Sequence, residues 1–366
     1  MTFKRFVGLA MIACLLLLSV IIVAETVCLG ELPENPKSIS AWANNAVTKR
    51  LSAFDSLKSL APNLLLKAGA KEQDGIFISN DYLLENIAAP DDAVLEANLL
   101  GIENFANESS TPIAFSLIPT ACAIKQQELP AGASLFNQKQ LISDCYSRLA
   151  GRAGSVDAYS SLFASKEQYT YCRTETALTG LGGYYVYTAL AARMGFSPRD
   201  LNQFEVENLP QSYYGELYSR CAYKDISPDL ITVYRFSRFS RQYRLNITQN
   251  GEQKSYYTLF PTHLAELGQP RQVLLGGLGE RTDISVVSPY EETLLILGDE
   301  TVSSFLPFLV VHYGDITVLD ISKCSDDMLK SINSDNYDQI LFCYSVDNFI
   351  HDDVCSRASL LGVDAV

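Results

Sequence analysis

The chain has 366 residues, of which 28 are basic and 42 are acidic, so its formal net charge is −14 at pH 7. Hydrophobic residues make up 48% of the sequence, and 21 glycines and 14 prolines are no enrichment, which excludes a collagen-like, coiled-coil or wholly disordered chain. Because binding to phosphate backbones requires clustered Lys and Arg, a nucleic-acid partner is not expected for such an acidic chain.

The first segment of the chain is predicted to be a membrane signal anchor. Lys4 and Arg5 precede residues 6–24, an uncharged run of 19 residues whose length as a helix nearly matches the hydrocarbon core of a bilayer. The positive flank would stay in the cytoplasm, so we expect a single-pass protein whose body is extracytoplasmic, at the cell surface. A cleaved secretory signal is the alternative, and it exports the body as well.

Three parts of the chain are expected: a cytoplasmic tip with the anchor at 1–28, a stalk with an amphipathic helix at 29–70, and an extracytoplasmic domain at 71–366. In that domain, short apolar runs alternate with segments of helical periodicity. Strands are predicted at 111–119, 155–159, 293–297, 316–319 and 339–344, and helices at 138–150, 180–194, 302–312 and 326–333. This alternation predicts a three-layer α/β domain with a mostly parallel sheet, in which ligands bind beyond the carboxyl ends of the strands.

Residues 197–281 differ from the rest of the domain and are predicted to form an insertion rich in strands and loops. Tyrosines and β-branched residues predominate there, and turns are expected at Asn250-Gly251 and Gly276-Gly277. Its tyrosines, such as Tyr213 and Tyr214, either pack in the core or present stacking rings to a sugar.

Nine cysteines are scattered along the chain without a CxxC pair. In an extracytoplasmic protein they are free to pair, but their spacing predicts no particular disulfide. Cys343 lies in the apolar run ILFCY, which favours a buried thiol that behaves as a small hydrophobic side chain.

Three loops at predicted strand ends carry the residues of chemical interest. They are YCRTETALT at 171–179, LLGGLGER at 274–281 and LLILGDETVSSFLPF at 294–308. Three further segments are IPT at 118–120, YGELYS at 214–219 and DQILFCYSVDNF at 338–349. Taken together in chain order, the six segments resemble those of the DHHW proteins. That bacterial extracytoplasmic family is related to the SGNH hydrolases and the alginate O-acetyltransferases. The resemblance runs from Asp74 to His351 and implies a three-layer SGNH-like, flavodoxin-like fold.

In that family the first loop typically reads RTDHHWT, the second GGNH, and the third a strand followed by DSY..SF. The resemblance implies a serine nucleophile, a histidine base that an aspartate orients, and an oxyanion stabilised by an asparagine and backbone amides. The first motif keeps its frame here at Arg173, Thr174 and Thr179. Its core differs, with Glu175 for the aspartate, Thr176 and Ala177 for the two histidines, and Leu178 for the tryptophan.

The other two motifs have also changed. Gly276 and Gly277 keep the glycines of the second motif, while Leu278 and Gly279 stand for its asparagine and histidine. In the third motif, Asp299 is kept and Glu300 stands for the nucleophilic serine. Nucleophile, base and oxyanion donor are thus absent together, although losing any triad member alone typically costs orders of magnitude in rate.

The chain has only three histidines, His263, His312 and His351, and none of them falls in the motif that supplies the base. We therefore interpret the chain as a pseudoenzyme of the DHHW family, anchored in the membrane by 6–24. As such it would bind a cell-surface polysaccharide, or a partner in polysaccharide O-acylation such as a multi-span membrane acyltransferase. No cofactor and no metal are expected.

Two alternatives remain open at this point. One is an active O-acetyltransferase or esterase of the cell envelope with a rearranged site, built on the carboxylates of Glu175, Asp299 and Glu300. The other is a structural protein of the envelope or spore coat. Ser303 and Ser304 are weak candidates for a replacement nucleophile, because they lie a turn into the predicted helix.

Candidate site residues fall into two groups. The altered family positions are Glu175, Ala177, Leu278 and Glu300, and the candidate groove residues are Arg173, Thr174, Asp299, Tyr214, Gly276 and Gly277. The acidic residues of the third motif also have a structural interpretation, in which Asp299 caps the helix that follows and Glu300 suits its positively polarised first turn.

Overall fold

The computed structural model describes residues 69, 71–221, 223–236, 242–287 and 290–362. The expected anchor at 6–24 lies outside the described residues. The stalk and amphipathic helix expected at 29–70 also lie outside them, apart from residue 69. Within the described part, no helix is both long enough and apolar enough to cross a membrane.

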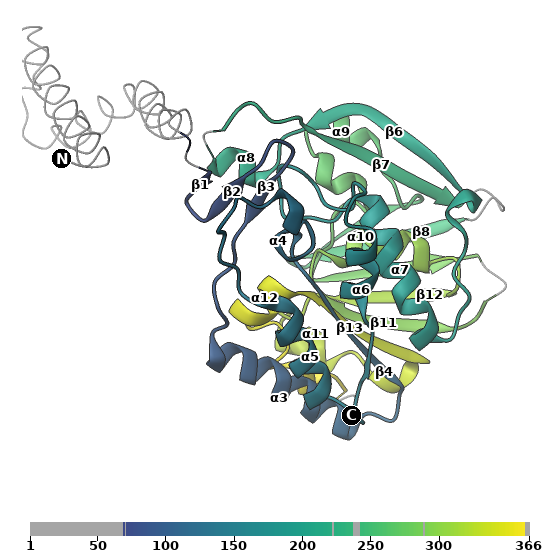
Figure 1. Ribbon diagram of the computed structural model, residues 1–366. Helices are drawn as coiled ribbons and strands as arrows, with labels where there is room; N and C mark the ends of the chain where they lie inside the picture. The colour runs from purple at the N-terminus through teal and green to yellow at the C-terminus, as the bar shows by residue number, and fades with distance from the viewer. Residues whose placement is uncertain (1–68, 70, 222, 237–241, 288–289, 363–366) are drawn as a thin grey trace, which may run out of the picture. The chain divides into compact units, whose positions relative to one another are not determined.

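Eight strands form the central sheet in the order β5-β4-β13-β11-β12-β10-β8-β9 (Figure 1). Their bounds are β4 (Ile113–Ile118), β5 (Gly154–Ser155), β8 (Tyr243–Gln249), β9 (Glu252–Tyr256), β10 (Arg281–Val286), β11 (Thr293–Gly298), β12 (Asp315–Leu319) and β13 (Gln339–Ser345). The first five strands in this order pair in parallel, and β10, β8 and β9 extend the sheet with antiparallel pairing. The predicted α/β fold with a mostly parallel sheet is confirmed.

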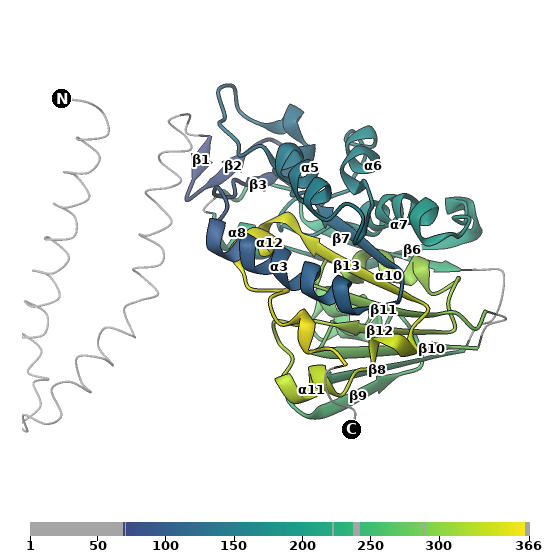
Figure 2. The ribbon, with the colours of Figure 1, turned by 90° about the horizontal axis from the view of Figure 1, so that it is seen from below.

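Helices cover both faces of this sheet. The α-helices of the described part are α3 (Asp92–Glu108), α4 (Ala121–Ile124), α5 (Gln138–Arg148), α6 (Ala158–Ala164), α7 (Gly180–Met194), α8 (Glu216–Arg220), α9 (His263–Glu266), α10 (Val302–Leu309), α11 (Asp326–Lys330) and α12 (Val346–His351). Figure 2 shows α6 and α7 on one side of the sheet and α11 on the other. The central strand β11 is accordingly buried on both faces, since its residues Leu294 to Leu297 are each 0% exposed.

Two small sheets complete the described part. β1 (Glu72–Gln73), β2 (Ile76–Ile78) and β3 (Leu83–Glu85) form one, and β6 (Phe204–Tyr213) with β7 (Asp229–Phe236) forms the other. The segment 197–281, predicted to be rich in strands and loops, contains β6, β7, β8 and β9. β8 and β9 belong to the central sheet and form a hairpin that turns at Asn250 and Gly251, both at positive φ.

Several predicted boundaries need correction. No strand spans 155–159, because β5 ends at Ser155 and Asp157 accepts a hydrogen bond from the Ser160 amide at 2.9 Å, which caps α6 from Ala158. The helix predicted at 302–312 ends at Leu309, and the one predicted at 326–333 ends at Lys330. The helix at 180–194 is confirmed, and Gly195 ends it in the left-handed conformation.

The described cysteines do not pair with one another. All seven are free and buried: Cys122, Cys145, Cys172, Cys221, Cys324, Cys343 and Cys355. The interpretation of Cys343 as a buried thiol is confirmed, whereas Cys14 and Cys28 lie outside the described residues.

Candidate functional site

A cavity of about 300 Å³ opens at the carboxyl ends of the parallel strands. Pro119 and Thr120 line it beyond β4, Glu300 beyond β11, and Asn348 beyond β13. Loops that follow neighbouring parallel strands meet at this edge of a sheet, so the cavity lies where the alternating pattern predicts a ligand site.

The loop of the first motif forms one wall of the cavity. Tyr171 and Leu178 pair as an isolated bridge, and the Cys172 amide donates a hydrogen bond to the Ala177 carbonyl at 2.9 Å. Thr179 then caps α7 through its side chain, which accepts from the Gly182 amide at 3.2 Å. The residues between the paired ends are thereby held as a tight loop, and Glu175 and Ala177 both line the cavity.

Asp229, the first residue of β7, holds this loop in place through hydrogen bonds. Its fully buried carboxylate accepts hydrogen bonds from the Arg173 and Thr174 amides at 2.6 and 2.9 Å. The hydroxyls of Thr174 and Tyr169 also donate to it. Arg173 turns away from the cavity, with its guanidinium 4.4 Å from the ring centroid of Tyr169. The frame residues of the first motif thus set the shape of the loop.

Glu175 is 4% exposed, and only one of its two carboxylate oxygens accepts a hydrogen bond from a described residue. Tyr213 donates a hydrogen bond to its Oε1 at 2.8 Å, whereas no donor among the described residues makes a hydrogen bond to Oε2. Arg271 Nε lies 3.6 Å from Oε2, within ion-pair range but too far for a good hydrogen bond. Burial raises the pKa of this carboxyl, and Arg271 and Tyr213 oppose the rise.

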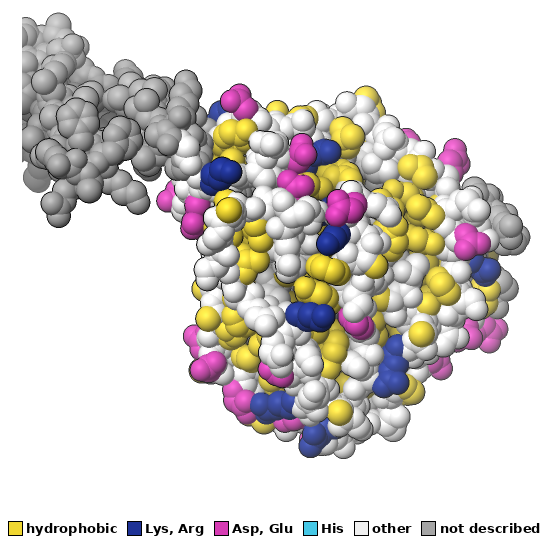
Figure 3. Space-filling view, in the orientation of Figure 1, with side chains coloured by type: hydrophobic (Ala, Val, Ile, Leu, Met, Phe, Trp, Pro, Cys, Tyr) yellow, Lys and Arg dark blue, Asp and Glu magenta, His cyan; other side chains and the backbone are white. Residues whose placement is uncertain are grey.

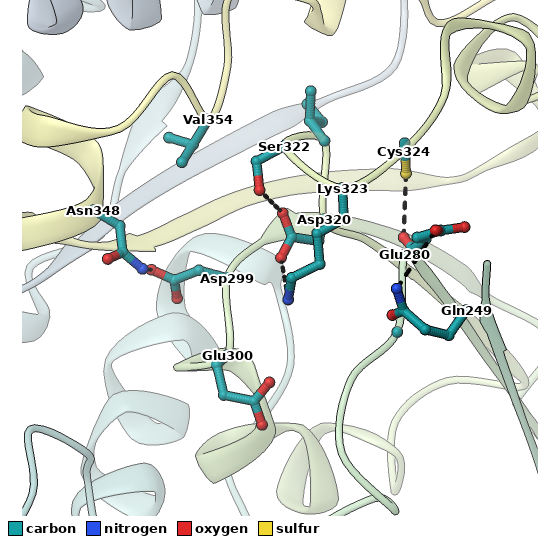
Figure 4. A network of polar contacts seen from close by, with 12 residues as sticks. Gln249, Glu280, Asp299, Glu300, Asp320, Ser322, Lys323, Cys324, Asn348 and Val354 are labelled. Atoms are coloured by element: carbon teal, nitrogen blue, oxygen red, sulfur yellow. Dashed lines mark hydrogen bonds and ion pairs between the residues drawn. The ribbon is translucent and has the colours of Figure 1, made fainter. Parts of the chain in front are cut away.

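The two acidic residues after β11 have different surroundings (Figure 4). Asp299 accepts from the Thr301 amide at 2.9 Å, and from the Ser345 amide and the Asn348 side chain at 2.8 Å each. It therefore ties the start of α10 to that of α12, which agrees with its interpretation as a capping residue.

Glu300 lines the cavity instead. Burial raises the pKa of its carboxyl, while Arg271, Lys323 and a hydrogen bond from the Leu278 backbone oppose the rise. Arg271 consequently acts on both cavity carboxyls, Glu175 and Glu300. Ser303 and Ser304 each donate to a backbone carbonyl at 2.7 Å, those of Glu300 and Thr301, so both hydroxyls are engaged within the helix start.

Of the second-motif loop at 274–281, Leu274 lines the cavity and the Leu278 backbone makes a hydrogen bond to Glu300. Leu275, Gly276 and Gly277 have positive φ values of 58°, 70° and 81°, which produces a sharp loop before β10. A Cβ on Gly276 would lie 2.7 Å from the Tyr256 ring, so this position has no room for a side chain. The turn predicted at Gly276-Gly277 is present.

The structure thus brings together only part of the predicted site. Glu175, Ala177 and Glu300 line the cavity, and Leu278 touches the site through its backbone. The residues that do not line it are Arg173, Thr174, Asp299, Tyr214, Gly276 and Gly277. Tyr214 stacks on Tyr218 with ring centroids 3.9 Å apart.

Sequence reasoning missed Arg271, Tyr213 as a partner of Glu175, and Asp229. Arg271 lies nearly a hundred positions from Glu175 in the sequence, in a stretch without a motif. No group of three or more His, Cys, Asp or Glu side chains arranged to hold a metal ion occurs among the described residues.

The fold and the cavity define a three-layer α/β protein with a candidate site at the carboxyl edge of its parallel strands. The chain belongs to the DHHW protein family, whose model matches residues 102–319. Among curated proteins, none matches the sequence.

Several solved structures are similar in fold. One is a DHHW family protein from Eubacterium siraeum, with a TM-score of 0.66 and 19% identity over 80% of this chain and 98% of that one. Another is Bacillus cereus PatB1 with a sulfonyl adduct, with a TM-score of 0.61 and 15% identity over 76% of this chain and 97% of that one.

Proposed function

We propose that this chain is a non-catalytic member of the DHHW family that binds a cell-surface polysaccharide in the cavity beside Glu175 and Glu300. The observation that carries the proposal is the place of Glu300. It follows β11 and lines the cavity, at the position where the family pattern has its nucleophilic serine. A half-buried glutamate that interacts electrostatically with Arg271 is an acceptor for ligand donors and a poor substitute for an activated hydroxyl.

The surroundings of Glu300 support the same proposal. Ala177, at a position where the family pattern has histidine, offers no base, and Leu278 offers no side-chain oxyanion donor. The two nearby hydroxyls of Ser303 and Ser304 donate within the helix start. The cavity keeps polar groups suited to sugar hydroxyls, including Thr120, Glu175 and Asn348.

The test of catalysis uses the purified full-length chain with an activated acetyl ester. We expect hydrolysis at the background rate, and no change on Glu300→Ala. Treatment with a sulfonyl fluoride, followed by mass spectrometry, should leave the cavity residues unmodified, with PatB1 as the positive control. Hydrolysis well above background that Glu300→Ala abolishes would refute the proposal.

The test of binding uses purified cell-surface polysaccharides and isothermal titration calorimetry. We expect at least one of them to bind, and Ala177→Trp, which fills the cavity, to abolish binding. The exposed Tyr257→Trp adds a comparable ring at a site that is 77% exposed, and it should leave binding unchanged. Absence of binding to every polysaccharide would favour a structural role in the envelope instead.

A second candidate is a carboxylate-based hydrolase or esterase. It is favoured by one observation, namely that burial raises the pKa of both Glu175 and Glu300 in a shared cavity. Carboxyls with raised pKa values are suited to general acid–base roles. This candidate requires turnover of an envelope ester or glycan that falls by orders of magnitude in both Glu175→Gln and Glu300→Gln.

The expected anchor at 6–24 completes the proposal, because it would hold the domain with the cavity on the extracytoplasmic side of the membrane. Fractionation of cells that produce the full-length chain, with protease added to intact cells, tests this location. Co-purification with a multi-span membrane acyltransferase would place the protein in a polysaccharide O-acylation system.

A further inference from the structure

The cavity contains an acceptor that the protein leaves unused. Glu175 lines the cavity, and its Oε2 is a buried atom to which no described group makes a hydrogen bond. Buried carboxylate oxygens without donors are costly and uncommon in native proteins. Tyr213 holds the other oxygen at 2.8 Å, which fixes the carboxylate in place. A ligand that donates a hydrogen bond would satisfy Oε2.

The charges around the cavity indicate what kind of donor this is. Its lining carries five acidic side chains, Glu85, Glu175, Glu216, Glu300 and Asp347, against one basic side chain, Arg271. Three of the acids have partners of their own outside the lining. Arg220 pairs with Glu85 and Glu216, and His351 Nδ1 lies 2.8 Å from Asp347 Oδ1.

Two carboxylates, Glu175 and Glu300, are left to share Arg271, whose side chain is 52% exposed. Lys323 also acts on Glu300, but it lies 2.8 Å from Asp320 and is largely neutralised by it (Figure 4). The centre of the cavity therefore has an excess of negative charge. By contrast, acidic and basic side chains are interspersed on the face drawn in Figure 3.

We infer that the cavity selects a glycan bearing a free ammonium group, such as an amino sugar that has lost its acetyl group, which would contact Glu175 and Glu300. This inference rests on the proposed function and names its ligand class. An ammonium offers the donor that Oε2 lacks and the positive charge that the carboxylate pair lacks. Burial raises the pKa of both carboxyls, so a cation between them also offsets the cost of keeping them ionised.

Other glycan types fit the cavity less well. An N-acetylated sugar brings one amide donor and no charge, so it leaves the carboxylate pair uncompensated. A uronate or phosphorylated sugar adds a further negative charge and is repelled by Glu175 and Glu300. The cavity, at about 300 Å³, is at the small end of the range for ligand sites, which suits recognition of one sugar unit of a longer chain.

The experiment titrates the full-length chain with three oligosaccharides of equal length: oligoglucosamine, its fully N-acetylated form, and an oligouronate. We expect oligoglucosamine to bind about tenfold or more tightly than the N-acetylated form, and the oligouronate not to bind. Equal binding of the first two would overturn the inference and leave the proposed function standing. Binding of none of the three, nor of any other polysaccharide, would overturn the proposed function itself.

Isosteric variants then test the residues. Glu175→Gln and Glu300→Gln keep the shape of the cavity, and each should bring the preference for oligoglucosamine to within about twofold. Glu205→Gln is the matched control, because it removes one negative charge at an exposed position in β6. A preference that survives in both cavity variants, or that falls equally in the control, would show that the net charge of the chain causes it, and would overturn the inference.

Discussion

Two buried carboxylates at the loop of the first motif, Glu175 within it and Asp229 from β7, have opposite hydrogen-bonding environments. Asp229 accepts from two backbone amides and from the hydroxyls of Thr174 and Tyr169. Glu175 accepts from Tyr213 alone, and its second oxygen has no donor among the described residues. Both side chains are almost fully buried, so burial does not distinguish them. The number of donors does.

The neighbours Asp299 and Glu300 differ in what their carboxylates face. Asp299 accepts three hydrogen bonds that join α10 to α12, while Glu300 faces the cavity. Carboxylates with a full set of donors contribute to folding, because removing them leaves several buried groups unpaired. Carboxylates with unused lone pairs in a cavity are available to a ligand. Substitutions at the two kinds of position should therefore have effects of opposite sign on stability.

The largest effect is expected for Asp229→Ala. The change leaves two amides and two hydroxyls without an acceptor in a buried place, and it should lower the free energy of unfolding by about 3–5 kcal/mol. Denaturant unfolding followed by circular dichroism measures this loss. Asp225→Ala removes an exposed carboxylate from the same segment and should change stability little. A loss below 1 kcal/mol at Asp229, on the order expected for a surface site, would remove the basis of the comparison.

A smaller loss is expected for Asp299→Ala. Its carboxylate accepts three hydrogen bonds but is adjacent to the cavity, so water can replace part of what is lost. We expect the free energy of unfolding to fall by about 2–3 kcal/mol. The measurement is again denaturant unfolding, with Asp335→Ala as an exposed control. A gain in stability at Asp299 would assign it to the ligand-facing group together with Glu300.

The sequence was sufficient to predict the elements whose signals are local. Four consecutive aliphatic residues identified β11, and Gly195 marked the end of α7. The strand predicted at 155–159 was wrong because the apolar run there is short and is interrupted by Asp157. This residue caps a helix that begins at Ala158. The local signal for this helix was Asp157, a residue type that caps helices, three positions before the Ser160 amide that it accepts from.

The candidate site was less predictable because it depends on contacts between distant segments. Resemblance to the family identified Glu175 and Glu300, which do meet at one cavity. Nothing near Arg271 or Asp229 in the sequence marks them as partners of the first motif, since tertiary packing alone brings them there. Tyr214 was an expected groove residue, yet its neighbour Tyr213 lines the cavity, because adjacent residues at the end of a strand point in different directions.

Tyr213→Phe tests the single donor that Glu175 possesses. Removing the hydroxyl leaves both carboxylate oxygens without a hydrogen bond, so we expect a loss of about 1–2 kcal/mol in the free energy of unfolding at neutral pH. Because this hydrogen bond lowers the pKa of Glu175, its removal raises that pKa further, so the loss of stability with rising pH should extend to a higher pH in the variant than in the parent chain. Tyr257→Phe, at a ring that is 77% exposed, is the control and should be neutral.

The smallest change is expected for Glu175→Gln, and it has the opposite sign. Burial raises the pKa of Glu175 in the folded chain above its ordinary value of 4.5. The folded state therefore holds a proton that the unfolded state releases, so this contribution to stability is full below pH 4.5 and is lost as the pH rises through the folded-state value.

Glutamine at position 175 cannot ionise, and its side-chain oxygen still accepts the hydrogen bond from Tyr213. The variant should match the parent chain in acid and exceed it in unfolding free energy at neutral pH, while Glu205→Gln should show no such pH-dependent gain. A variant less stable than its parent at neutral pH would mean that Arg271 already satisfies the ionised carboxylate, and that Glu175 belongs with Asp229.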